Sequence, residues 1–178
     1  MEKRLFVAVE IPEKQKRELF EKYSKILDSE KFKVVKPESL HLTLMFLGNI
    51  KEEEIPGLEE KFSKVSAKKF RLKIEGAGFF GKNIQWLGIS KGKQEIEKLA
   101  ANARNEIGFF GEEFKPHLTI ARNKNASSSE FAQAVKKIQE SKLSVEFSVD
   151  SFNLLESVLS PQGPKHSVLK EFRLSNIG

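Results

Sequence analysis

The sequence predicts an α+β fold with largely antiparallel sheets. Nine short apolar or alternating runs are typical of strands, and four longer segments with apolar residues three and four apart are typical of amphipathic helices. Several strands follow one another over short connections, which favours antiparallel pairing. Each half of the chain contains two of the helices, and this pattern indicates a duplicated unit.

The chain begins with a strand, a helix and two further strands. Leu5 to Val9 is an uninterrupted apolar run, which is typical of a buried strand. Pro12 then opens a helix at a position where its missing N–H has no consequence. The apolar stripe of this helix consists of Leu19, Phe20, Tyr23, Ile26 and Leu27. Residues 32–35 lead into a strand that ends at Gly48, and we expect its core face to consist of Leu42, Leu44 and Phe46.

A helix and a strand follow. Acidic residues 52–54 suit the start of a helix. Its apolar positions are Ile55, Leu58, Phe62 and Val65. Residues 70–74 alternate as a strand, which we expect to stop at the Gly76-Ala77-Gly78 stretch. Phe79 and Phe80 would then lie in a loop, where an aromatic ring is able to stack on a base or to join the core.

The second half repeats this alternation and then ends in strands. Residues 84–89 form a strand, and residues 92–107 form a helix that Gly108 closes. Ser127 and Glu130 have capping-box spacing ahead of a fourth helix. Three strands are expected at residues 143–149, 151–159 and 166–174, with a turn at residues 160–164.

The sequence His-Leu-Thr occurs twice, as His41-Leu42-Thr43 and as His117-Leu118-Thr119. The chain contains three histidines, and both of its threonines stand two residues after one of them. In a strand, residues two apart share a face. Each motif therefore presents an imidazole and a hydroxyl side by side on a face that is not the core face.

Two such pairs across a cleft suit phosphodiester chemistry. A neutral imidazole is able to take a proton from water while a protonated one gives a proton to the leaving oxygen, and histidine's ordinary pKa permits both forms near neutral pH. Two hydroxyls are able to hold the non-bridging phosphate oxygens. This scheme needs no metal, and we expect no metal site or cofactor. The alternative for a histidine on a strand is a purely structural role, which the double occurrence disfavours.

Composition and charge place the chain among ordinary folded domains. Its 178 residues are 39% hydrophobic and 31% charged, which fits one domain over residues 1–178. A net charge of +6 favours polyanionic ligands. The absence of cysteine excludes disulfides and thiol catalysis. No apolar run is long enough for a membrane span, and the first residues lack the organisation of a signal peptide. We therefore expect a cytoplasmic protein, and nothing indicates an oligomer.

Further stretches around the motifs carry a family resemblance. They are residues 4–9, Phe46-Leu47-Gly48 after the first motif, Ala121-Arg122 after the second, and residues 156–160 and 172–174. With the two motifs, they resemble the two-histidine (2H) phosphoesterases, in particular the RNA 2′,3′-cyclic phosphodiesterases that are also described as 2′-5′ RNA ligases. The resemblance covers nearly the whole chain. It implies two pseudo-symmetric lobes whose sheets flank a central cleft, with helices packed outside.

The resemblance also implies roles for the motif residues. His41 and His117 would be catalytic, with His117 as general base and His41 as general acid, and Thr43 and Thr119 would bind the phosphate. Expulsion of the 3′-oxygen from a 2′,3′-cyclic phosphate would leave a 2′-phosphomonoester, and the reverse reaction would be a 2′-5′ ligation.

Three further residues are candidates for the site. Lys115 shares strand parity with His117, provided that Pro116 does not break the strand, so it either reaches the phosphate or is a solvated lysine. Arg122 matches an arginine that commonly follows the family's second motif, and it either contacts phosphate or ties the strand end. His166 stands where relatives tend to have tyrosine, as a polar contact near the cleft or as a surface residue. The family's aromatic residue before the first motif is replaced by Val34-Val35.

The leading interpretation is a metal-independent cyclic phosphodiesterase acting on RNA ends, such as tRNA halves, without a membrane partner. One alternative keeps the chemistry and changes the substrate to a small cyclic nucleotide. Another is a non-catalytic module that binds RNA ends, although the presence of both histidines disfavours it. A nuclease that cleaves RNA by transesterification also fits the acid–base logic, but the paired threonines and the family resemblance disfavour it.

Overall fold

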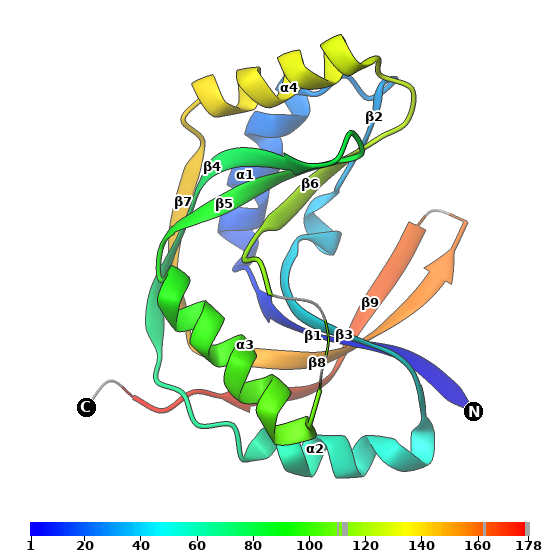
Figure 1. Ribbon diagram of the computed structural model, residues 1–178, viewed down its shortest axis with the longest axis vertical. Coiled ribbons are helices and arrows are strands. Elements are labelled where there is room, and N and C mark those ends of the chain that lie inside the picture. The colour runs from blue at the N-terminus through cyan, green and yellow to red at the C-terminus, as the bar shows by residue number, and fades with distance from the viewer. Residues whose placement is uncertain (110, 112–113, 162, 177–178) are drawn as a thin grey trace.

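The strands and helices follow one another in the order that the sequence predicts. A computed structural model describes residues 1–109, 111, 114–161 and 163–176 (Figure 1). Over these residues the chain forms nine strands, four α-helices and two short 3-10 helices. Their bounds are β1 (Glu2–Glu10), α1 (Glu13–Ile26), β2 (Phe32–Val34), η1 (Pro37–Ser39), β3 (His41–Lys51), η2 (Glu52–Glu54), α2 (Ile55–Ser63), β4 (Phe70–Phe80), β5 (Ile84–Lys91), α3 (Lys93–Ile107), β6 (Leu118–Asn123), α4 (Ser128–Glu140), β7 (Ser144–Val149), β8 (Ser151–Ser160) and β9 (Gly163–Arg173).

The strands form two antiparallel sheets, which confirms the predicted fold class. One sheet has the order β3-β1-β8-β9 and the other has the order β2-β6-β5-β4-β7. The first and last strands of the chain therefore share a sheet, while the middle of the chain builds the other. Each sheet contains one motif: His41 opens β3, and His117 immediately precedes β6.

Each sheet is covered by two helices on the outside of the molecule. Helices α1 and α4 pack on the sheet that contains β6, and α2 and α3 pack on the sheet that contains β3 (Figure 1). The helix pairs do not follow the halves of the chain, because each sheet is covered by one helix from the first half and one from the second. None of the helices in the described part of the chain is both long enough and apolar enough to cross a membrane.

The strand β1 is buried on both faces, which explains its uninterrupted apolar sequence. Leu5, Val7 and Val9 belong to the main core. Phe6 and Ala8 point to the other side, where they form a small second cluster with Leu155 of β8. A strand with one solvated face would alternate between apolar and polar residues, and this one does not because its second face forms the floor of a cleft.

The expectation that Phe46 belongs to the core is wrong, since its side chain is 65% exposed. Two neighbouring residues of β1 pair with Thr43 and Met45, and this leaves Leu44 without a partner in the ladder. Such a bulge shifts the alternation of side chains by one residue. Leu44 and Met45 are consequently both buried, and Phe46 emerges on the face of the first motif.

The expectation that Phe79 and Phe80 lie in a loop is also wrong. Strand β4 passes through the glycine-containing stretch and continues to Phe80, and only residues 81–83 form the turn to β5. Gly76 has a φ of 84°, and the pairing with β5 shifts between Ile74 and Ala77. The glycine therefore accommodates an irregularity in the strand instead of ending it.

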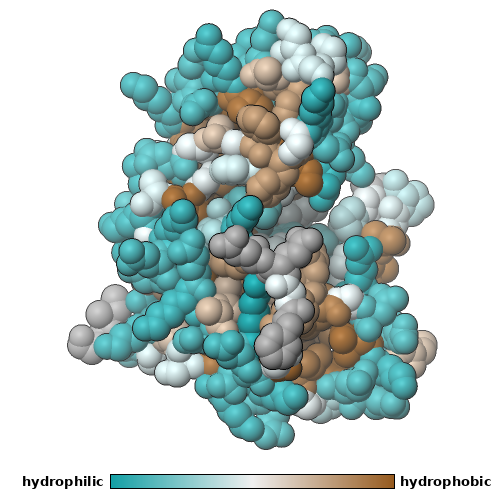
Figure 2. Space-filling view, in the orientation of Figure 1, coloured by the Kyte–Doolittle hydropathy of each residue, from teal (hydrophilic) through white to brown (hydrophobic). Residues whose placement is uncertain are grey.

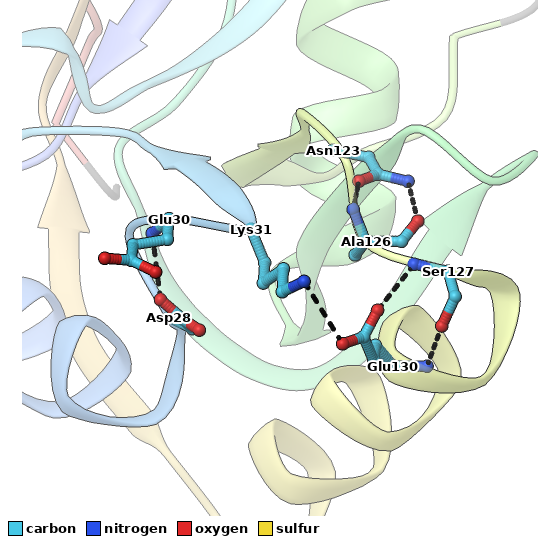
Figure 3. A network of polar contacts seen from close by, with 7 residues as sticks. All are labelled: Asp28, Glu30, Lys31, Asn123, Ala126, Ser127 and Glu130. Carbon is cyan, nitrogen blue, oxygen red and sulfur yellow. Dashed lines mark hydrogen bonds and ion pairs between the residues drawn. The ribbon is translucent and has the colours of Figure 1, made fainter.

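The end of the second sheet is fixed by a network of polar contacts that includes the predicted capping box (Figure 3). The backbone N–H of Glu130 donates to Ser127 Oγ at 3.3 Å, and the backbone N–H of Ser127 donates to Glu130 Oε2 at 2.7 Å. Lys31 Nζ lies 3.4 Å from Glu130 Oε1. The side chain of Asn123, the last residue of β6, exchanges hydrogen bonds with the backbone of Ala126. The network joins the end of β6 to the start of α4.

The hairpin of β8 and β9 is longer than the sequence indicates. Strand β9 begins at Gly163 rather than at residue 166, and the expected turn includes Gln162, which lies outside the described residues. Figure 2 shows that the far end of this hairpin stands out from the rest of the surface and carries hydrophobic residues. Val158 and Leu159 are 53% and 70% exposed there.

Candidate active site

One cleft of about 360 Å³ brings together both motifs. Its walls come from the two sheets, and its polar lining includes both motif histidines, both motif threonines and two arginines. The lining residues from the first sheet and the segment before it include Arg4, Phe6, Ser39, His41, Thr43, Phe46, Ser157 and His166. The second sheet and the segment before β6 contribute His117, Thr119 and Arg122.

His41 is placed by the start of β3. It pairs with Glu10 at the end of β1, and its neighbour Leu42 is buried in the core, so the imidazole points to the cleft side. The ring stands on Phe6, with the two ring centroids 4.9 Å apart. A hydrogen bond to the backbone of Ser39, two residues earlier, holds one of its ring nitrogens.

His117 is placed in an equivalent way on the opposite wall. Its Nδ1 donates to the carbonyl oxygen of Lys115 at 2.6 Å. The other ring nitrogen, Nε2, takes no part in this hydrogen bond. The ring packs edge-on against Phe80, at 4.8 Å between centroids, and Trp86 lies at 6.3 Å. Gly78 makes room for this indole, because a Cβ there would lie 2.3 Å from the Trp86 ring.

The two histidines therefore share a local design. Each bonds to the backbone two residues before it, and each packs against a phenylalanine ring from the sheet on its own side of the cleft. For His117, whose bonded atom is Nδ1, the hydrogen bond selects the tautomer with a free lone pair on Nε2. The motif threonines follow two residues later and line the same cleft.

The two histidines on the first wall have pKa values below that of free histidine. Burial lowers the pKa of His41 to about 4, and the charges of His166 and Lys16 act in the same direction. The hydrogen bond to Ser39 opposes them. Burial also lowers the pKa of His166, against the influence of Glu10. In the substrate-free protein His41 is consequently neutral at pH 7.

The structure brings most of the predicted site residues together, but it leaves out Lys115. His41, His117, Thr43, Thr119 and Arg122 all line the cleft. Strand β6 begins only at Leu118, so the strand parity assumed for Lys115 does not apply. Its side chain is exposed outside the cleft lining, and only its carbonyl oxygen takes part, through His117.

Several residues that line the cleft were not predicted from the sequence as part of the site. Arg4 and Phe6 lie two apart on β1 and line the cleft, as does Phe46 beyond the bulge in β3. The alternation Arg4-x-Phe6 was a usable signal, because it places both side chains on one face. The sequence allowed His166 to be either a polar contact near the cleft or a surface residue, and in the structure it lines the cleft. Among the described residues, no three His, Cys, Asp or Glu side chains lie close enough together to hold a metal ion.

Comparisons with known proteins agree with this geometry. The model of the 2′-5′ RNA ligase superfamily matches residues 12–160. A protein of Archaeoglobus fulgidus named RNA 2′,3′-cyclic phosphodiesterase is 32% identical over 177 residues, which cover 95% of this chain and 99% of that protein. A Thermus thermophilus protein of the same name is 32% identical over 187 residues, covering 96% and 90% of the two chains.

Solved structures show the same fold. The crystal structure of TT0787 from Thermus thermophilus superposes with a TM-score of 0.74 at 31% identity, covering 98% of this chain and all of the other. Escherichia coli LigT in its apo form superposes with a TM-score of 0.81 at 22% identity, covering 98% of each chain. With a family model that matches most of its length and relatives of similar length that share 32% of their residues with it, this chain belongs to the 2′-5′ RNA ligase superfamily, which confirms the resemblance to the two-histidine phosphoesterases.

Proposed function

We propose that this protein hydrolyses the 2′,3′-cyclic phosphate ends of RNA to 2′-phosphomonoesters by acid–base catalysis with two histidines. The observation that carries the proposal is the convergence of two His-x-Thr pairs, one from each sheet, on a single cleft. The names of the relatives as RNA 2′,3′-cyclic phosphodiesterases support the choice of substrate.

In the proposed mechanism, His117 is the general base and His41 is the general acid. Nε2 of His117 takes a proton from a water molecule, whose oxygen forms a bond to phosphorus. The bond from phosphorus to the 3′-oxygen breaks, and His41 protonates that oxygen. The hydroxyls of Thr43 and Thr119 donate to the non-bridging oxygens, where negative charge accumulates.

The lowered pKa of His41 gives substrate binding a second role. Without substrate the ring is neutral near pH 7, because its pKa is about 4. An anionic phosphate beside the ring favours the charged form and raises the pKa. The substrate therefore brings His41 into the protonated state that a general acid needs.

Arg4 and Arg122 support RNA rather than a free cyclic nucleotide as the substrate. They come from different sheets and line the same cleft as the histidines. Arginine suits phosphate recognition through its planar fork of donors, and the net charge of +6 favours a polyanion. The proposal includes a cytoplasmic monomer, a single two-lobed domain, tRNA halves as one class of substrate and 2′-5′ ligation as the reverse reaction.

The test is hydrolysis of a short RNA that ends in a 2′,3′-cyclic phosphate, in excess EDTA, by the wild type, His41→Ala and His117→Ala. Glu21→Gln, an exposed change on α1, is the control. We expect a 2′-phosphate product from the wild type and from the control, and loss of about 10²-fold or more in kcat for each histidine variant. Equal turnover by folded His41→Ala or His117→Ala would overturn the mechanism, and tight binding without turnover by the wild type would favour an RNA-end-binding module.

A parallel assay separates RNA from small nucleotides. A cyclic-phosphate dinucleotide and the corresponding cyclic mononucleotide are compared for the wild type and for Arg4→Gln at low and high salt. We expect Arg4→Gln to lower kcat/KM for the dinucleotide and to reduce its salt dependence, because a phosphate contact is lost. Equal kcat/KM for both substrates in the wild type would favour the small cyclic nucleotide.

A further inference from the structure

A third histidine stands beside His41 in the cleft, and the proposed mechanism does not use it. The rings of His41 and His166 lie edge to face with their centroids 5.0 Å apart. Phe6 lies 4.9 Å from His41 and 5.0 Å from His166, so the three rings form a triangle with nearly equal sides. Phe6 is only 2% exposed and forms the floor beneath both imidazoles.

The curvature of the first sheet brings the two imidazoles together. His41 belongs to β3 and His166 to β9, which stand at opposite edges of the order β3-β1-β8-β9. In a flat sheet three strand spacings would separate them by about 14 Å. They meet because the sheet bends around the cleft, and because Ser157, the partner of His166 on β8, is small. The contact between the rings is thus a product of the sheet's shape and not of local sequence.

His166 is also short of hydrogen-bond partners. Its Nδ1 is buried, and no described group forms a hydrogen bond with it. The main charged influences on the pair are Glu10, which acts on His166, and Lys16, which acts on His41, and these two groups form an ion pair at 3.9 Å. The remaining charged or titratable groups of the cleft, or adjacent to His166 on β9, are Arg4, Lys165, His117 and Arg122.

We propose that His166 is a positioning residue for His41: the two imidazoles stand on Phe6 as a pair that holds one positive charge at a time, so that His166 governs when His41 is protonated. The inference rests on the proposed function for its catalytic consequence, but the coupling itself is a property of the protein without substrate.

The direction of the coupling follows from the surroundings of the rings. A first proton goes to His166, which is the less buried of the two and which Glu10 favours in its charged form. A second proton on His41 would then face a like charge 5.0 Å away. The titration of one ring therefore depends on the state of the other, and the observed midpoints belong to the pair. An anionic phosphate beside His41 reverses the preference and draws the charge to the catalytic ring.

The coupling is measurable by NMR, because the chain has only three histidines. The imidazole C2 protons of the substrate-free protein are titrated from about pH 3 to about pH 8 and assigned with the single variants. In His166→Gln, we expect the midpoint of His41 to rise by between about 0.5 and about 2 pH units, the range for two unit charges at the observed ring separation. Lys165→Gln, which removes an exposed positive charge on the neighbouring residue, is the control and should leave the midpoint in place.

An unchanged midpoint of His41 in folded His166→Gln would overturn the inference. Where His166→Gln does not fold, His166→Phe keeps a ring on Phe6 and answers the same question. In the kinetic form of the test, the limb of the kcat/KM profile that His41 governs moves to higher pH in the variant, whereas a merely structural role would lower activity equally at every pH. A wild type without phosphodiesterase activity would refute the proposed function and leave the NMR result intact.

Discussion

Replacement of His41 by glutamine should make the protein less sensitive to acid. Burial lowers the pKa of His41 from 6.5 to about 4 in the folded state. Between these two values the unfolded chain binds a proton that the folded chain does not, so the free energy of unfolding rises with pH. The contribution is present in full above pH 6.5 and is lost as the pH falls towards 4. A difference of about 2.5 units corresponds to about 3 kcal/mol.

The measurement is the free energy of unfolding by urea at a series of pH values from about 4 to about 7.5, for the wild type and His41→Gln. Carboxylates also titrate at the lower end, but they are the same in both proteins. The difference between the two proteins therefore reports the titration of His41 together with its coupling to His166. We expect the variant to lose about 3 kcal/mol less than the wild type over this range. Parallel loss of stability in the two proteins would refute the description of His41 as a buried, neutral side chain.

Three further changes test other parts of the structure. Tyr23→Phe removes the 2.5 Å hydrogen bond from the buried hydroxyl to the carbonyl of Val35, and urea unfolding should show a loss of about 1–3 kcal/mol; no loss would mean that water replaces the bond. Phe46→Ala should leave stability within about 0.5 kcal/mol, because the ring is exposed. We expect this ring to stack on a base of an RNA end, so the same change should raise the KM of that substrate about tenfold; an unchanged KM would exclude stacking there. Ser127→Ala should lower the free energy of unfolding by about 1 kcal/mol through loss of the cap on Glu130, and an equal urea midpoint would contradict that role.

Patterns with a fixed period were the predictable part of this protein. The order of the elements, the capping box at Ser127 and the shared face of His and Thr within each motif all depend on residues two, three or four apart in sequence. The meeting of the two motifs in one cleft was implied by the family resemblance and not by these spacings. Such spacings translate directly into faces of strands and helices. His41 and Thr43 could be placed on one face without knowledge of any other strand.

Irregularities and long-range contacts were not predictable. The bulge at Leu44 reverses the side of Phe46, and it exists only in the pairing with another strand. In the sequence Gly76 predicts the end of a strand, but in the structure the strand continues and Gly76 lies where its pairing register with β5 shifts. The position of His166 beside His41 depends on how the sheet curves, which no local pattern encodes. The strand parity expected for Lys115 does not hold, because β6 begins only at Leu118, after Pro116.

The interleaved strand order also fixes when the cleft between the two sheets is completed during synthesis. The sheet that contains β6 is finished once residue 149 has been made, since its five strands all lie between residues 32 and 149. The other sheet needs β1 to pair with β8, for example Leu5 with Glu156, across almost the whole chain. Closing so long a loop has a high entropic cost, which slows the pairing. The N-terminus of a chain is also made first, so β1 must wait for β8. The wall with His117 can therefore form on a nascent chain, while the wall with His41 and His166 awaits the last strands, so an unfinished polypeptide lacks one wall of the cleft that contains both motifs.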